Sequence, residues 1–231
     1  MLKSYNLIFY YLLYTIFGEN QVKSLFITAT NTNIGKTYAT KKLIKALSKA
    51  GNKVGVYKPI ETGVTDNTPL DATTLLEYAK RFNPNLKELT PKDITAYTFT
   101  LPSAPFCADT NNIIDIEHII QKYHQLSKMC DILLVEGAGG LMVPITKDFF
   151  MIDLIKKLDT KTLLITPSHL GCINETLLSI KALQDHNIEF QWCVNLHKDK
   201  DSFDKVTKPF YDSYFEKWWS LEEVELSKII F

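Results

Sequence analysis

The sequence has no excess of either charge and no cysteine pair of the kind that binds a metal. Lysine plus arginine and aspartate plus glutamate both total 26 in 231 residues, so the formal net charge is zero. Such a chain has no strong field to attract nucleic acid or an anionic membrane, and we expect neither as a partner. The four cysteines are widely spaced without a C-x-x-C pair, which argues against zinc ribbons and fits a reducing, cytoplasmic compartment.

The first segment contains no apolar run long enough to span a membrane. Its run from Leu7 to Phe17 is shorter than the roughly 20 residues of a transmembrane helix. A signal peptide is an alternative, but Lys3 is the single charge before this run and no A-x-A-like cleavage site precedes Gly18. We therefore expect an N-terminal extension over residues 1–22 and one domain over residues 23–231.

No internal repeat, low-complexity tract or Gly/Ser linker interrupts the chain, so a second domain is not expected. Apolar segments alternate with amphipathic ones, which predicts an α/β fold with a mostly parallel sheet between two layers of helices. The segment 83–112 is expected to be a long irregular excursion, and such loops are often functional. Strands are expected at 24–28, 53–59, 131–137, 161–167 and 190–196, and helices near 36–50, 70–81, 115–128, 151–157 and 173–186.

The segment 28–37, TATNTNIGKT, lies between a predicted strand and a predicted helix. A strict phosphate loop has a glycine five positions before its Gly-Lys pair, where this chain has Thr30. The order strand, loop, Gly-Lys-Thr and helix nevertheless favours a phosphate loop over a polar turn, and with it a three-layer fold like that of P-loop NTPases. Backbone amides would then hold phosphate oxygens, Lys36 would reach the β- and γ-phosphates, and the Thr37 hydroxyl would bind Mg²⁺.

Other polar residues follow the remaining strands and should border the same crevice at the carboxyl edge of the sheet. Lys58 ends the second strand and Thr62 follows it, so this cation is either solvated or able to bind an anionic substrate or a migrating phosphoryl group. Glu136 lies in VEGAGG, which is either a second magnesium carboxylate beside open backbone amides or a glycine-rich turn. Asp71 starts a helix, where it could serve as the N-cap, reach the metal, or do both.

A last helix start follows the fourth strand. The amides of Gly171, Cys172, Ile173 and Asn174 could hold a carboxylate there, and an ordinary capped helix explains the segment equally well.

The order of these motifs, T-x-T-x-x-GKT, YKP…TG, a lone aspartate, VEGAGG and LGCIN, resembles dethiobiotin synthetase from about residue 24 to about residue 195. The resemblance implies a homodimeric, cytosolic ligase of biotin synthesis that depends on ATP and Mg²⁺. Such enzymes close the ureido ring of dethiobiotin from 7,8-diaminopelargonate and CO₂, through a carbamate and a carbamic-phosphoric anhydride.

The resemblance also implies roles for single residues. Lys36, Lys58 and Thr32 would surround the carbamate and the γ-phosphate as catalytic groups. The nucleotide would contact Asn33, Ile34, Gly35, Lys36, Thr37, Tyr38 and Asn195, and Mg²⁺ would bind Thr37, Asp71 and Glu136. The substrate would contact Thr62, Gly139 and, from the partner subunit, Gly171, Cys172, Ile173 and Asn174. The family usually has a glycine at position 29, where this chain has Ala29. It often has an acidic residue at position 33, where this chain has Asn33.

Three other classes of protein share parts of this pattern. A MinD/ParA-like ATPase would be a switch without ligase activity, but its loop has a second lysine where this chain has Asn31. An amidotransferase-type ligase acting on cobyrinic acid needs a glutaminase domain, for which 231 residues leave no room. A non-enzymatic nucleotide-binding module would not need Lys58 to face the γ-phosphate.

Overall fold

A five-stranded parallel sheet forms the centre of the computed structural model, which describes residues 23–197 and 200–223. Its strands run in the spatial order β2-β5-β1-β8-β9, and every pair of neighbours is parallel. These strands confirm the five predicted from sequence. Their bounds are Lys23–Ala29 for β1, Val54–Tyr57 for β2, Ile132–Gly140 for β5, Lys161–Thr166 for β8 and Phe190–Val194 for β9.

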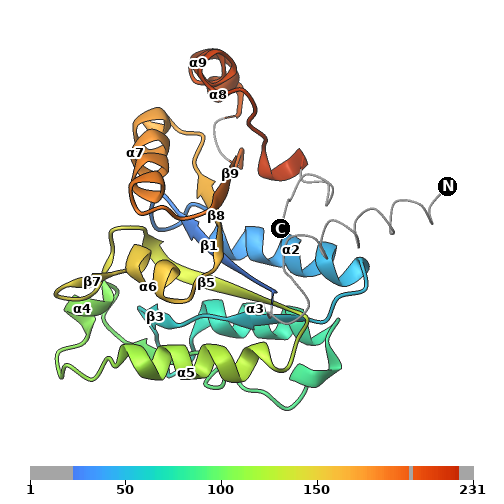
Figure 1. The fold of residues 1–231 in the computed structure, drawn as a ribbon, viewed down its shortest axis with the longest axis vertical. Helices are drawn as coiled ribbons and strands as arrows, with labels where there is room; N and C mark the ends of the chain where they lie inside the picture. The colour runs from blue at the N-terminus through green and yellow to red at the C-terminus, as the bar shows by residue number, and fades with distance from the viewer. Residues whose placement is uncertain (1–22, 198–199, 224–231) are drawn as a thin grey trace.

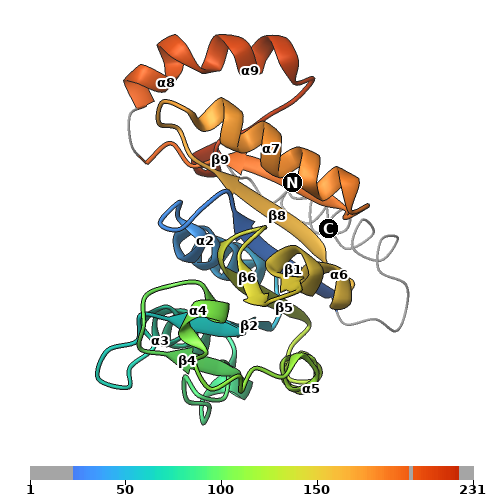
Figure 2. The same ribbon diagram turned by 90° about the vertical axis from the view of Figure 1, so that its left-hand side faces the viewer.

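Helices cover both faces of the sheet, as Figure 1 and Figure 2 show. Helices α2 (Lys36–Lys49) and α3 (Leu70–Lys80) pack together on one face. The other face carries α5 (Ile116–Ser127), α6 (Met151–Lys157) and α7 (Cys172–Asp185). Because both faces are covered, the strands are almost continuously buried and apolar, which is the pattern that identified them in the sequence.

The predicted irregular excursion 83–112 contains short elements that return it to the end of β2. They are η1 (Pro84–Leu86), β4 (Tyr97–Phe99) and α4 (Pro105–Ala108). Strand β4 pairs in parallel with β3 (Ile60–Thr62), and α4 contacts β6 (Pro144–Thr146), which forms a hairpin with β7 (Phe149–Phe150). The excursion is therefore held against the carboxyl edge of the sheet.

Two short helices that the sequence analysis missed lie beyond β9, at the top of Figure 1. They are α8 (Lys200–Val206) and α9 (Lys208–Tyr214), and η2 (Leu221–Glu223) follows them. Each of the two helices has 7 residues, too few for an apolar periodicity to be recognised. They are held by a second core of aromatic rings, in which Tyr211 packs edge-on against Trp192 and Phe215.

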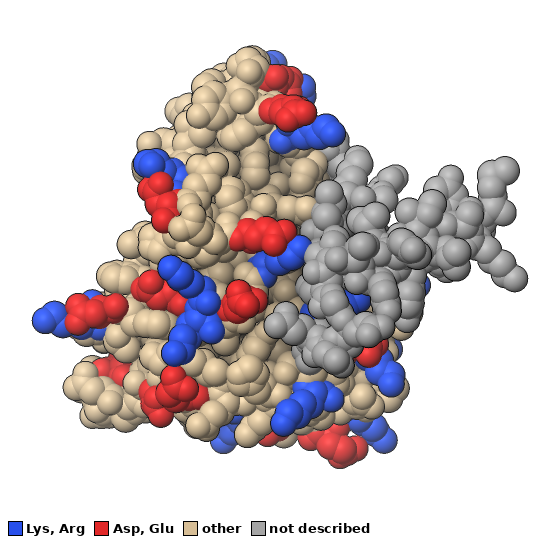
Figure 3. All heavy atoms as spheres, in the orientation of Figure 1, with Lys and Arg blue, Asp and Glu red and all other residues tan. Residues whose placement is uncertain are grey.

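The surface shows no dominant charge on the face drawn in Figure 3, where basic and acidic side chains are interspersed. Within the two described ranges, no helix combines the length and the apolar character that crossing a bilayer requires. The predicted extension, residues 1–22, lies outside the described residues, so it and the boundary of the domain at residue 23 stay predictions.

We expect Leu134→Ala to lower the free energy of unfolding by about 2–5 kcal/mol, because it leaves a cavity at a fully buried position. Leu134 lies in the middle of β5, opposite Leu25 of β1 and Val56 of β2. Urea denaturation measures the change. Leu178→Ala on α7 is the matched control, because that side chain is 61% exposed and its loss should change stability by no more than about 0.5 kcal/mol. Equal losses in both variants would contradict this assignment of the core.

Candidate active site

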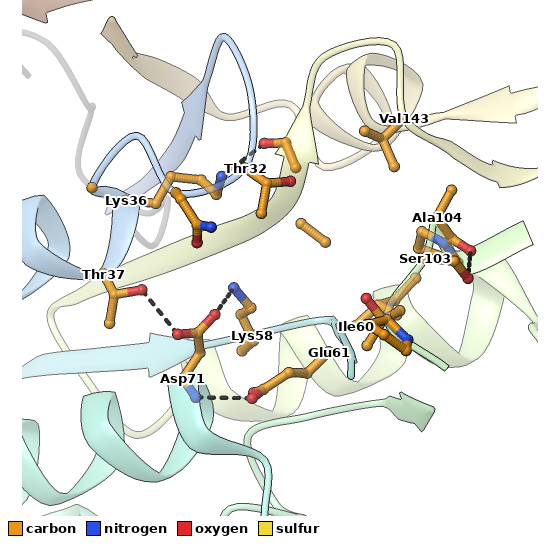
Figure 4. Close-up of a pocket in the computed structure, with 17 residues that line it drawn as sticks. Thr32, Lys36, Thr37, Lys58, Ile60, Glu61, Asp71, Ser103, Ala104 and Val143 are labelled. Carbon is orange, nitrogen blue, oxygen red and sulfur yellow. Dashed lines mark hydrogen bonds and ion pairs between the residues drawn. The ribbon is translucent and has the colours of Figure 1, made fainter. Parts of the chain in front are cut away.

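A pocket of about 550 Å³ opens at the carboxyl ends of β1, β2 and β5 (Figure 4). It brings together predicted residues from segments far apart in the chain, namely Thr32, Asn33, Gly35, Lys36, Thr37, Lys58, Thr62, Asp71 and Gly139. It is also lined by residues that sequence reasoning did not single out, namely Ile60, Glu61, Pro102, Ser103, Ala104, Pro105, Ala138 and Val143. Pro102 to Pro105 belong to the excursion that was expected to be functional.

The loop between β1 and α2 is fixed from three neighbouring elements. The Thr30 amide donates to the carbonyl of Ile165 in β8, at 3.2 Å, and the Thr30 hydroxyl donates to Glu175 of α7, at 3.0 Å. After β9, the side-chain amide of Asn195 donates to the carbonyl of Ile34, at 2.8 Å. These contacts hold the loop against β8, α7 and the segment after β9.

Backbone geometry explains two residues of the loop. Gly35 has φ +104°, and a side chain there would also clash with the Asn195 amide. Asn33 has φ +60°, a left-handed conformation that asparagine tolerates better than most residues. This conformation gives a physical reason for an asparagine at position 33.

Lys36 links the loop to the end of β5. Its ammonium group donates to the carbonyls of Asn31 and Gly139, each at 2.9 Å, and the residue is buried. Burial lowers the pKa of Lys36 to about 8, helped by the charge of Lys58 and opposed by Glu136 and Asp71. The predicted phosphate-binding cation therefore lies at the junction of the loop and the VEGAGG segment.

Lys58 lies among acceptors at the end of β2. Its ammonium nitrogen is 2.8 Å from a carboxylate oxygen of Asp71, 2.8 Å from one of Glu136, and 3.3 Å from the carbonyl of Gly137. Burial alone would lower the pKa of Lys58, but the two carboxylates outweigh that effect and raise it above the usual range. Lys58 is therefore a permanent cation on the floor of the pocket.

The two carboxylates that contact Lys58 differ in their exposure. Glu136 is fully buried, and it accepts hydrogen bonds from Thr37, at 2.9 Å, and Thr40, at 2.8 Å, as well as from Lys58. The Asp71 side chain is 44% exposed, lines the pocket and accepts a bond from Thr37, at 3.2 Å. Burial raises the pKa of Asp71, but Lys58 outweighs it and the net shift is downward.

One interpretation of the sequence places Asp71 at the N-cap of its helix, and this interpretation is wrong. Helix α3 begins at Leu70 with Pro69 as its N-cap, and Asp71 is its second residue. Glu61 instead accepts from the backbone amides of Asp71 and Ala72. Burial raises the pKa of Glu61, although these two amides oppose the shift. The sequence carries no signal for this contact, because Glu61 precedes the helix by nine residues.

The remaining predicted residues lie outside the main pocket. Asn195 borders a smaller pocket of about 90 Å³ on the other side of the loop, with Asn33 and Ile34. Tyr38 is 47% exposed on α2, beneath the ammonium group of Lys42.

The start of α7 does not line the main pocket of its own chain either. Cys172 is fully buried and its amide donates to the carbonyl of His169, so that amide is not free to hold a carboxylate as expected. Gly171, Ile173 and Asn174 lie beside it at the start of the helix.

The pKa of Lys36 predicts a pH dependence of stability in the nucleotide-free protein. An unfolded lysine titrates near pH 10.4, so between pH 8 and 10.4 the unfolded chain binds more protons and stability rises with pH. From pH 7 to 9.5 the wild type should gain about 2 kcal/mol relative to Lys36→Met, in which this titration is absent. Denaturation of both proteins at the two pH values tests this. Parallel changes in both would show that Lys36 titrates normally.

The chain is similar to known proteins in sequence and in fold. A family described as an AAA domain matches residues 23–208. Among solved structures, a plasmid partition protein from Borrelia burgdorferi has a TM-score of 0.53 and 13% identity, over 87% of this chain and 90% of that chain. At this identity the likeness shows the fold alone.

Two relatives in sequence share one name, ATP-dependent dethiobiotin synthetase BioD. The protein from Sulfurovum sp. (strain NBC37-1) is 63% identical over 202 residues, which cover 87% of this chain and 96% of the relative. The protein from Wolinella succinogenes is 36% identical over 204 residues, which cover 87% of this chain and 94% of the relative. The chain therefore belongs to the dethiobiotin synthetase family.

Proposed function

We propose that this chain is an ATP-dependent ligase that closes the ureido ring of dethiobiotin from 7,8-diaminopelargonate and CO₂, in the synthesis of biotin. The relatives in sequence carry the name of this activity. The observation that carries the proposal is the convergence of Lys36 and Lys58 on one pocket. A module that only held a nucleotide would need the phosphate loop, but it would not need a second permanent cation on the floor of the same pocket.

The chemistry requires charge neutralisation and positioning rather than a covalent enzyme intermediate. One amine of the substrate captures CO₂ as a carbamate, and ATP phosphorylates the carbamate with release of ADP. The second amine then attacks the mixed anhydride, which closes the ring and expels phosphate. Each of these steps involves anionic oxygens and two reactants that must be held close together. Fixed cations and backbone amides supply that environment at no cost of reorganisation.

The loop residues would bind the nucleotide in this proposal. Lys36 would exchange its two carbonyl partners for the β- and γ-phosphates, while Thr32 would face the carbamate from the rim of the pocket. The backbone from Asn33 to Tyr38, at the start of α2, would hold phosphate oxygens. Asn195, beyond the loop in the smaller pocket, would contact the purine.

The donor set fits Mg²⁺ as the metal that accompanies ATP. Thr37, Asp71 and Glu136 offer only oxygen atoms, which this ion prefers, and the Thr37 hydroxyl already lies within hydrogen-bonding distance of both carboxylates. Within the described ranges no group of three or more His, Cys, Asp or Glu side chains comes together, so these residues would share the ion with phosphate oxygens. When bound, the ion would neutralise charge on the transferred phosphoryl group.

The substrate would lie between the main pocket and a partner subunit. Thr62 and Gly139 line the main pocket and would face the carbamate end. Gly171, Ile173 and Asn174 do not line that pocket, so their contact with the far carboxylate of the substrate would have to come from a second copy of the chain, without the Cys172 amide, which already donates to His169. We therefore propose a homodimer, acting in the cytoplasm.

The activity is tested by measuring ADP release from Mg²⁺, ATP and bicarbonate, with and without 7,8-diaminopelargonate. We expect release that depends on the diamine, together with a cyclic urea product seen by mass spectrometry. ATP hydrolysis that does not depend on the diamine would instead favour a MinD/ParA-like switch.

Lys58 should matter for turnover more than for nucleotide binding. We expect Lys58→Ala to lower kcat by roughly 100-fold or more, because one preorganised charge opposite the reacting oxygens is lost. The Kd for ATP should change by less than about threefold, because Lys36 and the loop remain. Steady-state kinetics and calorimetric ATP titration measure the two effects, with the exposed Lys45→Ala on α2 as the control.

Removal of Lys58 also leaves Glu136 buried without its cation, which costs about 3–5 kcal/mol of stability. Lys58→Arg keeps the charge and tests turnover in a protein that retains this pairing. An equal loss of ATP affinity and of kcat in both variants would assign Lys58 to simple nucleotide binding.

A further inference from the structure

The residue at the N-cap position of helix α3 makes no capping hydrogen bond with its side chain. This residue is Pro69, which has no side chain able to accept a hydrogen bond from the first turn. The first amides of a helix have no partner within the helix and must be satisfied from elsewhere. A residue of another element accepts hydrogen bonds from amides of this first turn instead.

That residue is Glu61, in the middle of β3. One of its carboxylate oxygens accepts from the Asp71 amide at 2.8 Å (Figure 4), and the other accepts from the Ala72 amide at 2.9 Å. Glu61 itself is buried, and its backbone is fixed opposite Thr98 in the ladder of β3 and β4. A negative charge at this end of a helix is also stabilised by the helix dipole.

The cap acts on the residue that joins the helix to the pocket. The Asp71 carboxylate accepts from Thr37 through one oxygen, at 3.2 Å, and from Lys58 through the other, at 2.8 Å. Glu61 accepts a hydrogen bond from the backbone amide of the same residue, Asp71. Two sets of contacts therefore fix the position of this carboxylate. They are its own hydrogen bonds and the hydrogen bond from the Asp71 backbone amide to Glu61.

We propose that Glu61 is a positioning residue, which holds Asp71 where its carboxylate meets the metal and phosphates of the bound nucleotide. This inference rests on the proposed function, because it takes Asp71 to face Mg²⁺ and ATP. The rival role for a pocket-lining carboxylate is to bind an ammonium group of the diamine. Both oxygens of Glu61 are directed to backbone amides, so the geometry favours the positioning role.

The test compares Glu61→Gln with the wild type in ATP binding at a series of Mg²⁺ concentrations. Glutamine keeps the shape but has one acceptor oxygen and an NH₂ group that cannot accept from an amide. We expect the Mg²⁺ concentration at half-maximal binding to rise about tenfold, as is usual when the support of a metal ligand is lost. ATP affinity without Mg²⁺ and the KM for the diamine should change by less than about twofold.

Glu77→Gln is the matched control. It makes the same substitution within α3, the helix that Glu61 caps, at a side chain that is 60% exposed and pairs only with Lys80 among the described contacts. It should leave the Mg²⁺ dependence unchanged. Glu61→Asp, which keeps the charge on a shorter side chain, serves if Glu61→Gln does not fold, and should show a shift in the same direction.

Amide hydrogen exchange gives a readout that does not depend on turnover. In the nucleotide-free protein, Glu61→Gln should speed the exchange of the Asp71 and Ala72 amides. Faster exchange with an unchanged Mg²⁺ dependence would reduce Glu61 to a structural cap and overturn the proposal. A raised KM for the diamine with an unchanged Mg²⁺ dependence would assign Glu61 to substrate binding, and would overturn it as well.

The failure of the proposed function would look different. A wild type that binds ATP in a Mg²⁺-dependent way but releases no ADP in response to the diamine would reject the ligase activity. The Mg²⁺ titration of Glu61→Gln would still decide the role of Glu61.

Discussion

The site depends on one ion cluster, in which the buried ammonium group of Lys58 lies between the half-exposed Asp71 and the buried Glu136. Lys58 directly follows β2 and Glu136 lies within β5, and the pairing of Tyr57 with Val135 in the sheet brings the two residues together. Neither could be buried alone, because an uncompensated charge in the interior costs several kcal/mol. The cluster therefore ties the chemistry of the pocket to the pairing of the strands beneath it.

Much of the fold could be predicted because the central strands are buried on both faces. Runs such as Leu133, Leu134 and Val135 are continuous in their apolar character, and α2 and α5 show one apolar face each. The phosphate loop was recognisable without the glycine at position 30, since its place between β1 and α2 carries the signal. Likewise, Lys36, Lys58, Thr37 and Asp71 meet in one pocket because parallel strands end at the same edge.

What could not be predicted depends on contacts between distant segments. Nothing in the sequence distinguishes Glu61 from the other acidic residues. The pairing of β3 with β4 places its side chain at the start of α3. The full burial of Glu136 depends on Thr40, a residue that looks like an ordinary part of an amphipathic helix. Helices α8 and α9 are too short to show a period, and their packing is decided by aromatic partners such as Trp192. Propensity and pattern are local, whereas these features are tertiary.

The contact between Asn195 and Ile34 has a consequence for how the protein is made. The two residues are 161 positions apart, so during synthesis the loop leaves the ribosome long before the side chain that fixes it. Its bonds to Ile165 and Glu175 also await later segments of the chain. A nascent chain can form α2 early, but β1 must wait for its partners β5 and β8, and the mature shape of the loop belongs to the nearly finished domain. Partial products that lack β8 and β9 would therefore lack the contacts that fix the loop.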